Sequence, residues 1–233
     1  MKPIGLFCHW HTGSTILTKI LAAAGMQVGN NSTGFIDRKA GQEHPVISTA
    51  CNTAYLHSIG RLEEFDGELA KGRMTEALTS YVKQAEKNNW KCFGIKSNFM
   101  LGSYCWDLFG SIFKTVWPKM QIIITLRHPI DICKTTNDDS WPDEQVVKSW
   151  MDTVEVTKEL VKDGAILIQF PFNKVQLKSM LQALGLKHSK SVVDTYNVKN
   201  IKNISTAAQI KAFEKKHPGV GKAFAELKKL TVG

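Results

Sequence analysis

Apolar residues recur along the chain in two different spacings that alternate with each other. Short and nearly continuous apolar runs extend from Ile4 to Cys8, Trp90 to Ile95, Met120 to Leu126 and Ala165 to Phe170. Apolar runs of four to eight residues, bounded by turn residues, are typical of strands that are buried on both faces of a sheet. The sequence therefore predicts four such strands, of which the run from Met120 to Leu126 is the clearest.

Between these runs, the apolar residues follow the spacing of a helix. The first helix comes directly after the first strand and places Ile16, Ile20 and Ala24 on one face. Further helices are predicted at Val46 to His57, Gly67 to Asn89, Tyr104 to Trp117, Pro142 to Val161, Lys174 to Leu184, Thr206 to Lys216 and Val220 to Leu230, with another beginning at Pro129. Strands that alternate with helices predict an α/β fold, a three-layer α/β/α domain with a central parallel sheet.

Length and composition fit one globular domain over residues 1–233. The chain is 43% hydrophobic and 22% charged, which suits a single α/β domain of this size. We find no internal repeat and no low-complexity tract. The polar, glycine-rich stretch from Gly29 to Pro45 is predicted to be a loop, and its length indicates a functional role.

The net charge of +9 favours anionic partners, which include nucleic acid, acidic lipid and highly charged small ligands. The lysines are spread along the chain, and there is no arginine-rich tract or aromatic–basic repeat of the kind that nucleic-acid modules use. We therefore expect no nucleic-acid partner. No apolar run approaches the length of a membrane span.

The cysteines indicate a reducing compartment. There are five, an odd number, and none forms a C-x-x-C pair. We expect reduced, mostly buried thiols in a cytoplasmic protein, and neither a disulfide framework nor a metal site. The N-terminal apolar run is also too short for a signal peptide.

Polar residues that carry chemistry directly follow three of the predicted strands. They are His11 to Thr15, Lys96 to Asn98 and Arg127 to Asp131. Ligands of parallel α/β sheets bind beyond the carboxyl ends of the strands. We therefore expect these three segments to converge on one edge of the sheet.

The first of these segments has the layout of an anion site. The opening amides of a helix have no partner within the helix and carry partial positive charge, Gly13 permits a close approach, and Thr12, Ser14 and Thr15 add hydroxyl donors. An ordinary helix N-cap is the alternative interpretation. The spacing G-x-x-x-x-G-K-[ST] is absent, which argues against ATP or GTP with magnesium.

Two motifs and their order resemble those of sulfotransferases. The segment His11 to Leu17 is similar to the 5′-phosphosulfate loop of that family, and the segment Ile124 to Thr135 resembles its 3′-phosphate motif. Gly94 to Lys96 resembles the Trp-Gly-x-Lys segment of the bacterial branch, and Ala183 to His188 resembles a helix end of that branch. The likeness covers roughly Pro3 to Leu186.

The resemblance implies a P-loop-like fold of the sulfotransferase type and a cofactor. The cofactor is 3′-phosphoadenosine 5′-phosphosulfate (PAPS), bound by His11, Thr12, Gly13, Ser14 and Thr15 at its 5′ end. Arg127 and Thr135 would hold its 3′-phosphate, and a planar guanidinium suits that task. The sequence departs from the family at three sites, with histidine at His11 for Lys or Arg, threonine at Thr135 for Ser, and Ser97-Asn98-Phe99 after Lys96.

The implied reaction is transfer of a sulfuryl group to a hydroxyl or amine of a small molecule or glycan. His11 and Lys96 are the candidates for stabilising the charge that develops, by analogy with phosphoryl transfer. Glu43 and His44 are the candidates for the general base, with an ordinary turn carboxylate as the alternative interpretation of Glu43, and His57 and His128 are further options. A binder that kept the nucleotide site without catalysis, and a small-molecule kinase of related fold, are the alternatives. The oligomeric state is not predicted.

Overall fold

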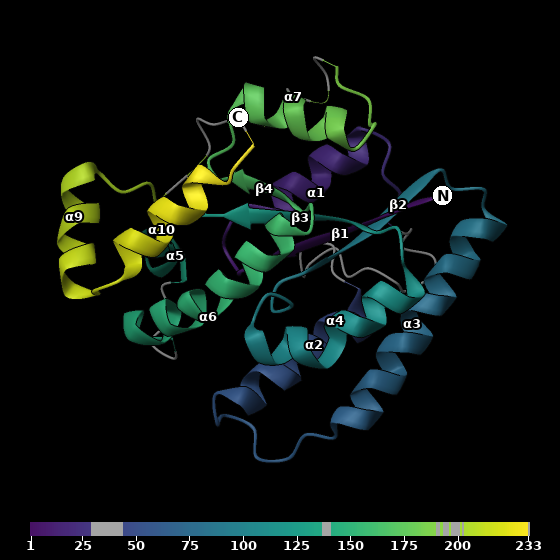
Figure 1. The fold of residues 1–233 in the computed structure, drawn as a ribbon, viewed down its shortest axis with the longest axis horizontal. Coiled ribbons are helices and arrows are strands. Elements are labelled where there is room, and N and C mark those ends of the chain that lie inside the picture. Colours follow the sequence, from purple (N-terminus) through teal and green to yellow (C-terminus); the bar gives the residue numbers. More distant parts are fainter. Residues whose placement is uncertain are drawn as a thin grey trace.

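Four parallel strands form the centre of the protein. The computed structural model describes residues 1–28, 44–136, 141–189, 192, 196, 201 and 203–232. The strands are β1 (Lys2–Cys8), β2 (Cys92–Ser97), β3 (Gln121–Leu126) and β4 (Ile166–Gln169). They lie in the order β2-β1-β3-β4, and every neighbouring pair is parallel (Figure 1). The predicted α/β class with a central parallel sheet is confirmed.

The helices begin and end within a few residues of the predicted positions. They are α1 (Ser14–Ala23), α2 (Pro45–Ser58), α3 (Gly67–Lys87), α4 (Ser103–Val116), α5 (Pro129–Thr136), α6 (Asp143–Lys162), α7 (Lys174–Ala183), α9 (Ala207–Lys216) and α10 (Val220–Lys229). The predicted loop from Gly29 to Pro45 lies outside the described residues up to position 43.

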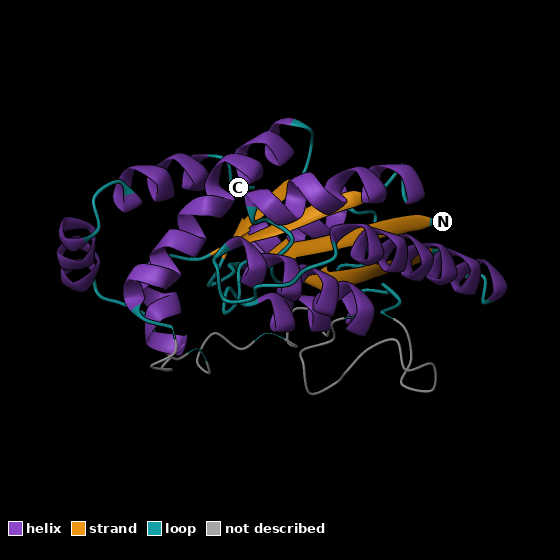
Figure 2. Ribbon diagram, turned by 90° about the horizontal axis from the view of Figure 1, so that it is seen from below, coloured by secondary structure: helices purple, strands orange, loops and turns teal. Residues whose placement is uncertain are grey.

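Helices cover both faces of the sheet, as expected for three layers. Alternate strand residues point to opposite faces, so Leu6 and Ile123 meet α1 and α7 on one side. Phe7 and Ile124 meet α2, α3, α4, α6 and α10 on the other side. Figure 2 shows the strands as one twisted sheet between the helices. Both faces are apolar, which explains why the strands are near-continuous hydrophobic runs.

The order of the strands reverses beside β1. The chain passes from β1 to β2 on one side and then crosses to β3 on the other side of β1. In open α/β sheets the crevice at such a reversal, beyond the carboxyl ends of the strands, is where ligands bind. The turn after β1 and the turn after β3 therefore flank the expected binding position.

The C-terminal helices form a small unit at the carboxyl end of β3 (Figure 1). Phe213 and Val220 pack on Ile130 of α5. His128 links the same parts, because its Nδ1 accepts from the Ile130 N–H at 3.3 Å and its Nε2 lies 3.3 Å from Glu214. His128 is buried between these segments, so its role in the structure is packing.

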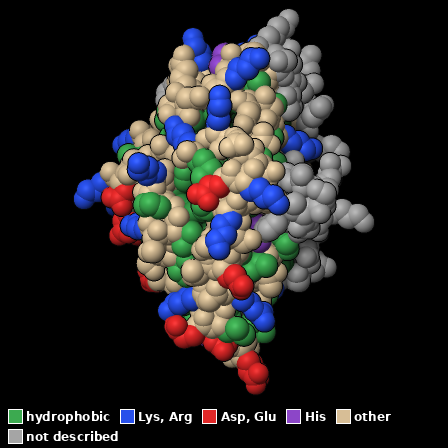
Figure 3. Space-filling view, turned by 90° about the vertical axis from the view of Figure 1, so that its right-hand side faces the viewer, with side chains coloured by type: hydrophobic (Ala, Val, Ile, Leu, Met, Phe, Trp, Pro, Cys, Tyr) green, Lys and Arg blue, Asp and Glu red, His purple; other side chains and the backbone are tan. Residues whose placement is uncertain are grey.

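The remaining sequence expectations concern cysteines and surface charge. All five cysteines are free thiols, and only Cys133 is not fully buried. On the face that Figure 3 shows, Lys and Arg side chains are scattered among acidic and hydrophobic ones and form no stripe. Among the described residues, no helix has the length and apolarity to span a membrane. The same residues contain no group of three or more potential metal ligands.

Gly94 allows β1 and β2 to approach each other, and this generates a prediction. A Cβ at Gly94 would lie 2.6 Å from the Ile4 carbonyl oxygen, which is backbone and cannot move aside. Gly94→Ala should therefore lower the free energy of unfolding by about 2–3 kcal/mol in urea denaturation. Gly72→Ala is the matched control, because Gly72 is exposed within α3 and its Cβ would meet nothing. The free energy of unfolding of Gly72→Ala should rise by about 0.5–1 kcal/mol. Equal changes in the two variants would contradict the close approach of β1 and β2 at Gly94.

Candidate functional site

The turn between β1 and α1 has an unusual backbone. His11 has a φ of 58° and Gly13 a φ of 84°, and α1 begins at Ser14 with Gly13 as its N-cap. The Thr12 hydroxyl donates to the His9 carbonyl at 2.7 Å, so its only proton is used. Thr125 of β3 then donates to the same hydroxyl at 2.6 Å. The Thr12 side chain is fully buried and holds the turn against β3.

Gly13 is required by space as well as by conformation. A Cβ at this position would overlap the ring of Phe170, which follows β4. Phe170 is buried, and its ring also lies 5.1 Å from the guanidinium carbon of Arg127. One aromatic ring therefore supports both the glycine turn and the arginine, a role for Phe170 that the sequence did not predict beyond the end of a strand.

Lys96 brings a second positive charge to the turn. It is the penultimate residue of β2 and pairs with Leu6 of β1. The side chain is 2% exposed, and its Nζ donates to the Thr15 hydroxyl at 3.3 Å in the first turn of α1. The structure thus brings together Lys96 and Thr15, two residues that are 81 positions apart and were both predicted to belong to the site.

Arg127 connects the turn after β3 with the turn after β1. Its Nη1 donates to the His11 carbonyl at 2.7 Å, and its Nη2 donates to the Asn203 carbonyl at 3.1 Å. Arg127 is 4% exposed, and burial lowers its pKa from the usual value while Asp131 raises it. A buried guanidinium at the meeting point of two turns is a strong recognition group for a phosphate or sulfate.

Thr135 is joined to Arg127 through Asn203. The Thr135 hydroxyl donates to the Asp131 carbonyl at 2.7 Å, and the Asn203 side-chain amide lies 3.4 Å from that hydroxyl. The Asn203 carbonyl is the one that Arg127 contacts. Asp131 also accepts from the Ser205 N–H at 2.8 Å. The segment at Asn203 to Ser205 therefore lies across the predicted 3′-phosphate residues, an arrangement that the sequence did not indicate.

The pKa of His11 depends on the positive charges around the turn. Its side chain is exposed, yet its pKa is lowered from the usual 6.5, first by desolvation and then by the positive charges of Arg127 and Lys96. The imidazole is therefore neutral at pH 7. An anion bound at this turn would offset the two cations and raise the pKa of His11, which favours the protonated form.

His9 and an aromatic cluster lie beside the turn. His9 is buried, stacks on Trp10 at 3.7 Å and bonds Ser149 at 3.1 Å. Burial lowers its pKa to about 3. In the unfolded chain the imidazole of His9 takes up a proton near pH 6.5, whereas in the folded chain it does so only near pH 3. The folded state therefore loses stability as the pH falls from about 6.5 toward 3.

Trp10 contacts three further rings, which are Tyr55, Phe99 and Trp141.

The other predicted acid–base groups lie elsewhere or outside the description. Glu43 falls outside the described residues. His44 is buried before α2, and burial lowers its pKa to about 4. His57 donates through Nδ1 to the Leu62 carbonyl at 3.0 Å and packs against Phe65. Neither histidine contacts the turn at Gly13 in the described part of the chain.

The fold has a known counterpart. A solved sulfotransferase domain from the olefin synthase of Synechococcus PCC 7002 superposes with a TM-score of 0.52. The match covers 99% of this chain and 88% of that domain, at 13% sequence identity. No protein-family profile and no curated protein sequence matches the chain. The likeness at this identity establishes a sulfotransferase-like fold.

The contact between Gly13 and Phe170 predicts the cost of a side chain in the turn. Gly13→Ala should lower the free energy of unfolding by about 2–4 kcal/mol, because a strained φ and an overlap with the ring act together. Gly25→Ala is the control, since Gly25 has a φ of 112° with open space around it. This control should lower the free energy of unfolding by only about 1 kcal/mol, with both variants measured by denaturation in guanidinium chloride. Similar losses for both variants would refute the role of Phe170.

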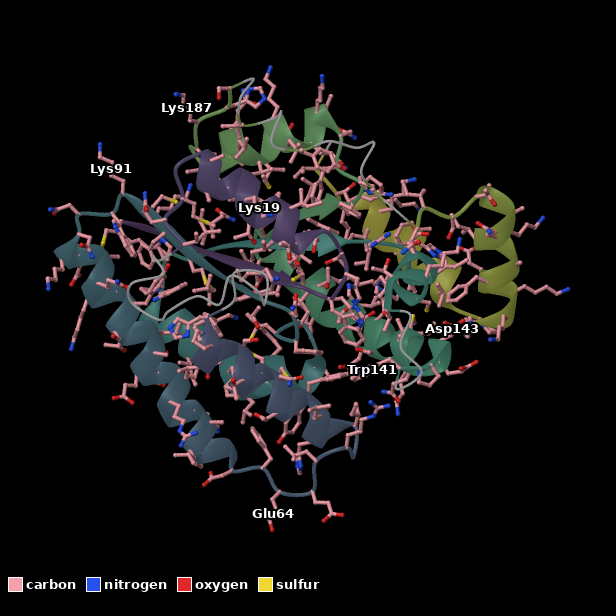
Figure 4. The ribbon with its side chains drawn as sticks, turned by 180° about the vertical axis from the view of Figure 1, so that it is seen from behind. Lys19, Glu64, Lys91, Trp141, Asp143 and Lys187 are labelled. Atoms are coloured by element: carbon pink, nitrogen blue, oxygen red, sulfur yellow. The ribbon has the colours of Figure 1, made fainter. Side chains whose placement is uncertain are left out.

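The lowered pKa of His11 gives a second prediction. Lys96→Met removes a nearby positive charge, so the pKa of His11 should rise toward 6.5 in an NMR titration of the imidazole protons. Lys19→Met is the control, because Lys19 is exposed on α1 and projects away from the sheet (Figure 4). A His11 pKa that stays constant in Lys96→Met, or moves equally in both variants, would contradict the proposed cluster.

Proposed function

We propose that this protein is a sulfotransferase that moves a sulfuryl group from PAPS to a hydroxyl or amine of a small molecule or glycan. The observation that carries the proposal is the meeting of Lys96 and Arg127, two almost fully buried cations, at the turn that begins α1. A polyanionic ligand at this position would be attracted by both cations, which together with the larger effect of desolvation lower the pKa of His11.

The residues at the two turns fit the two ends of such a donor. The amides that open α1, together with Lys96 and Thr15, would hold the 5′-phosphosulfate. Arg127 and Thr135 would hold the 3′-phosphate, with the Asn203 segment closing over it. The bonds from the Arg127 guanidinium to the His11 and Asn203 carbonyls orient its planar fork at the meeting point of the two turns.

When bound, the donor supplies an activated sulfuryl group. The chain then has to orient it, stabilise the negative charge on the bridging oxygen, and remove a proton from the acceptor. Lys96 and the α1 amides provide the positive potential, and His11 becomes a second donor as the ligand raises its pKa. We assign the proton-accepting role to Glu43 as a proposal, because it lies two positions before the first residue of α2 in the sequence and a carboxylate suits that task.

The acceptor would lie against the aromatic cluster. Trp10 is adjacent to His11 in the turn, and its partly buried ring meets Phe99 at 5.3 Å and Trp141 at 5.2 Å. Aromatic faces bind apolar rings and the C–H faces of sugars without demanding a particular polar pattern. Asn98, at the end of β2, lies 3.2 Å from the Cys8 thiol and faces the same edge of the sheet.

A second candidate function is nucleotide binding without catalysis. One observation favours it: the pKa of His11 is lowered, so this histidine lacks the permanent positive charge of the Lys or Arg that sulfotransferases have at this place. Both functions predict nucleotide binding. They differ in whether PAPS is consumed when a panel of phenols, alcohols, amines and oligosaccharides is supplied.

Calorimetry with adenosine 3′,5′-bisphosphate tests the shared part of these functions. The nucleotide should bind at low salt without magnesium. Arg127→Lys should lower the affinity for the nucleotide about tenfold, since a lysine keeps the charge and loses the planar fork. Arg73→Lys, on the exposed side of α3, should leave the affinity unchanged. Absence of binding, or preference for magnesium–ATP over the bisphosphate, would exclude the proposal. Binding with no transfer to any acceptor would select the second candidate.

A further inference from the structure

A cleft of about 770 Å³ lies between α2 and α3, apart from the turn at Gly13. Its volume falls within the range of small-molecule sites in proteins. The residues that line it are His44, Pro45, Val46, Thr49, Ala50, Thr53, Leu62, Glu64, Phe65, Asp66, Leu69, Ala70, Arg73, Glu76, Ala77 and Ser80. None of these residues is among those to which the proposed sulfuryl transfer gives a role in donor binding.

The floor of the cleft is apolar and partly exposed. Val46 at the start of α2 is 38% exposed, and Leu69 in the first turn of α3 is 51% exposed. Phe65 and Ala77 continue the apolar lining between the two helices. Large side chains of this kind are unfavourable in water, and a cleft that gathers them gains free energy when a ligand covers them.

The rim of the cleft is acidic although the protein is basic. Glu64, Asp66 and Glu76 oppose one guanidinium, that of Arg73, which gives this lining a net charge of −2. His44 adds no charge near pH 7, because burial lowers its pKa to about 4. The whole chain carries +9. Figure 4 shows Glu64 at the outer tip of the connection between α2 and α3, where it faces solvent.

We propose that the α2–α3 cleft binds an amphipathic amine, a small molecule with an apolar body and a positively charged head. The apolar body would cover Val46, Leu69 and Phe65, while the ammonium group would lie at the rim near Glu64 and Glu76. The proposal rests on charge complementarity and apolar area within one cavity. It does not depend on the proposed sulfuryl transfer, since within the described part of the chain the cleft and the donor site share no residue.

Fluorescence titration with dansylcadaverine, an apolar ring system with a primary amine, tests this site directly. The full chain should bind it more tightly than dansyl-6-aminohexanoate, in which a carboxylate replaces the amine. The double variant Glu64→Gln/Glu76→Gln should lower the affinity for the amine about fivefold, because two rim charges are lost. The same double variant should leave the affinity for the carboxylate probe unchanged or raise it. A higher salt concentration should also lower the affinity for the amine.

A matched pair of exposed carboxylates outside the lining serves as the control. Glu63→Gln/Glu86→Gln changes the net charge equally and should leave the affinity for the amine unchanged. Thr53→Trp fills the cleft and should abolish binding, with circular dichroism used to verify the fold. Equal affinity for the two probes, or equal losses in the two double variants, would overturn the proposal. A dimer in sedimentation that Thr53→Trp dissociates would overturn it too, because the cleft would then be an interface between copies.

Discussion

A charge-assisted hydrogen bond joins the two turns on which the candidate site depends. Arg127, directly after β3, donates to the carbonyl of His11, directly after β1, at 2.7 Å. The bond forms because β1 and β3 are parallel neighbours, so both turns leave the sheet at the same edge. Hydrogen bonds from a charged donor are about twice as strong as neutral ones. The site is therefore fixed by sheet topology before any ligand arrives.

Close packing beneath this bond supports the turn from within the sheet. Phe170 occupies the space where a side chain at Gly13 would project, and it also supports the guanidinium of Arg127. Thr12 and Thr125 join the turn to β3 from within. The amides that open α1 are thus directed by residues of β3 and of the turns that follow β3 and β4. A rigid frame of this kind lowers the conformational cost of binding an anion.

Much of this fold was predictable from the chain alone, because buried parallel strands and amphipathic helices have distinct apolar spacings. The convergence of Lys96 and Arg127 on the turn at Gly13 followed from the rule for carboxyl ends of parallel strands. The roles of Phe170 and Asn203 did not follow, since each depends on a contact between distant segments: Asn203 lies 76 positions beyond the arginine that it contacts. The lowered pKa of His11 likewise depends on cations that only the fold brings near.

The central claim is that the two turns bind one anionic ligand together. A crystal structure of the protein soaked with adenosine 3′,5′-bisphosphate tests it most directly. The account predicts the 5′-phosphate at the amides that open α1, near Lys96, and the 3′-phosphate against Arg127. A nucleotide that occupies only one turn, or that binds away from both while they remain accessible in the crystal, would contradict it.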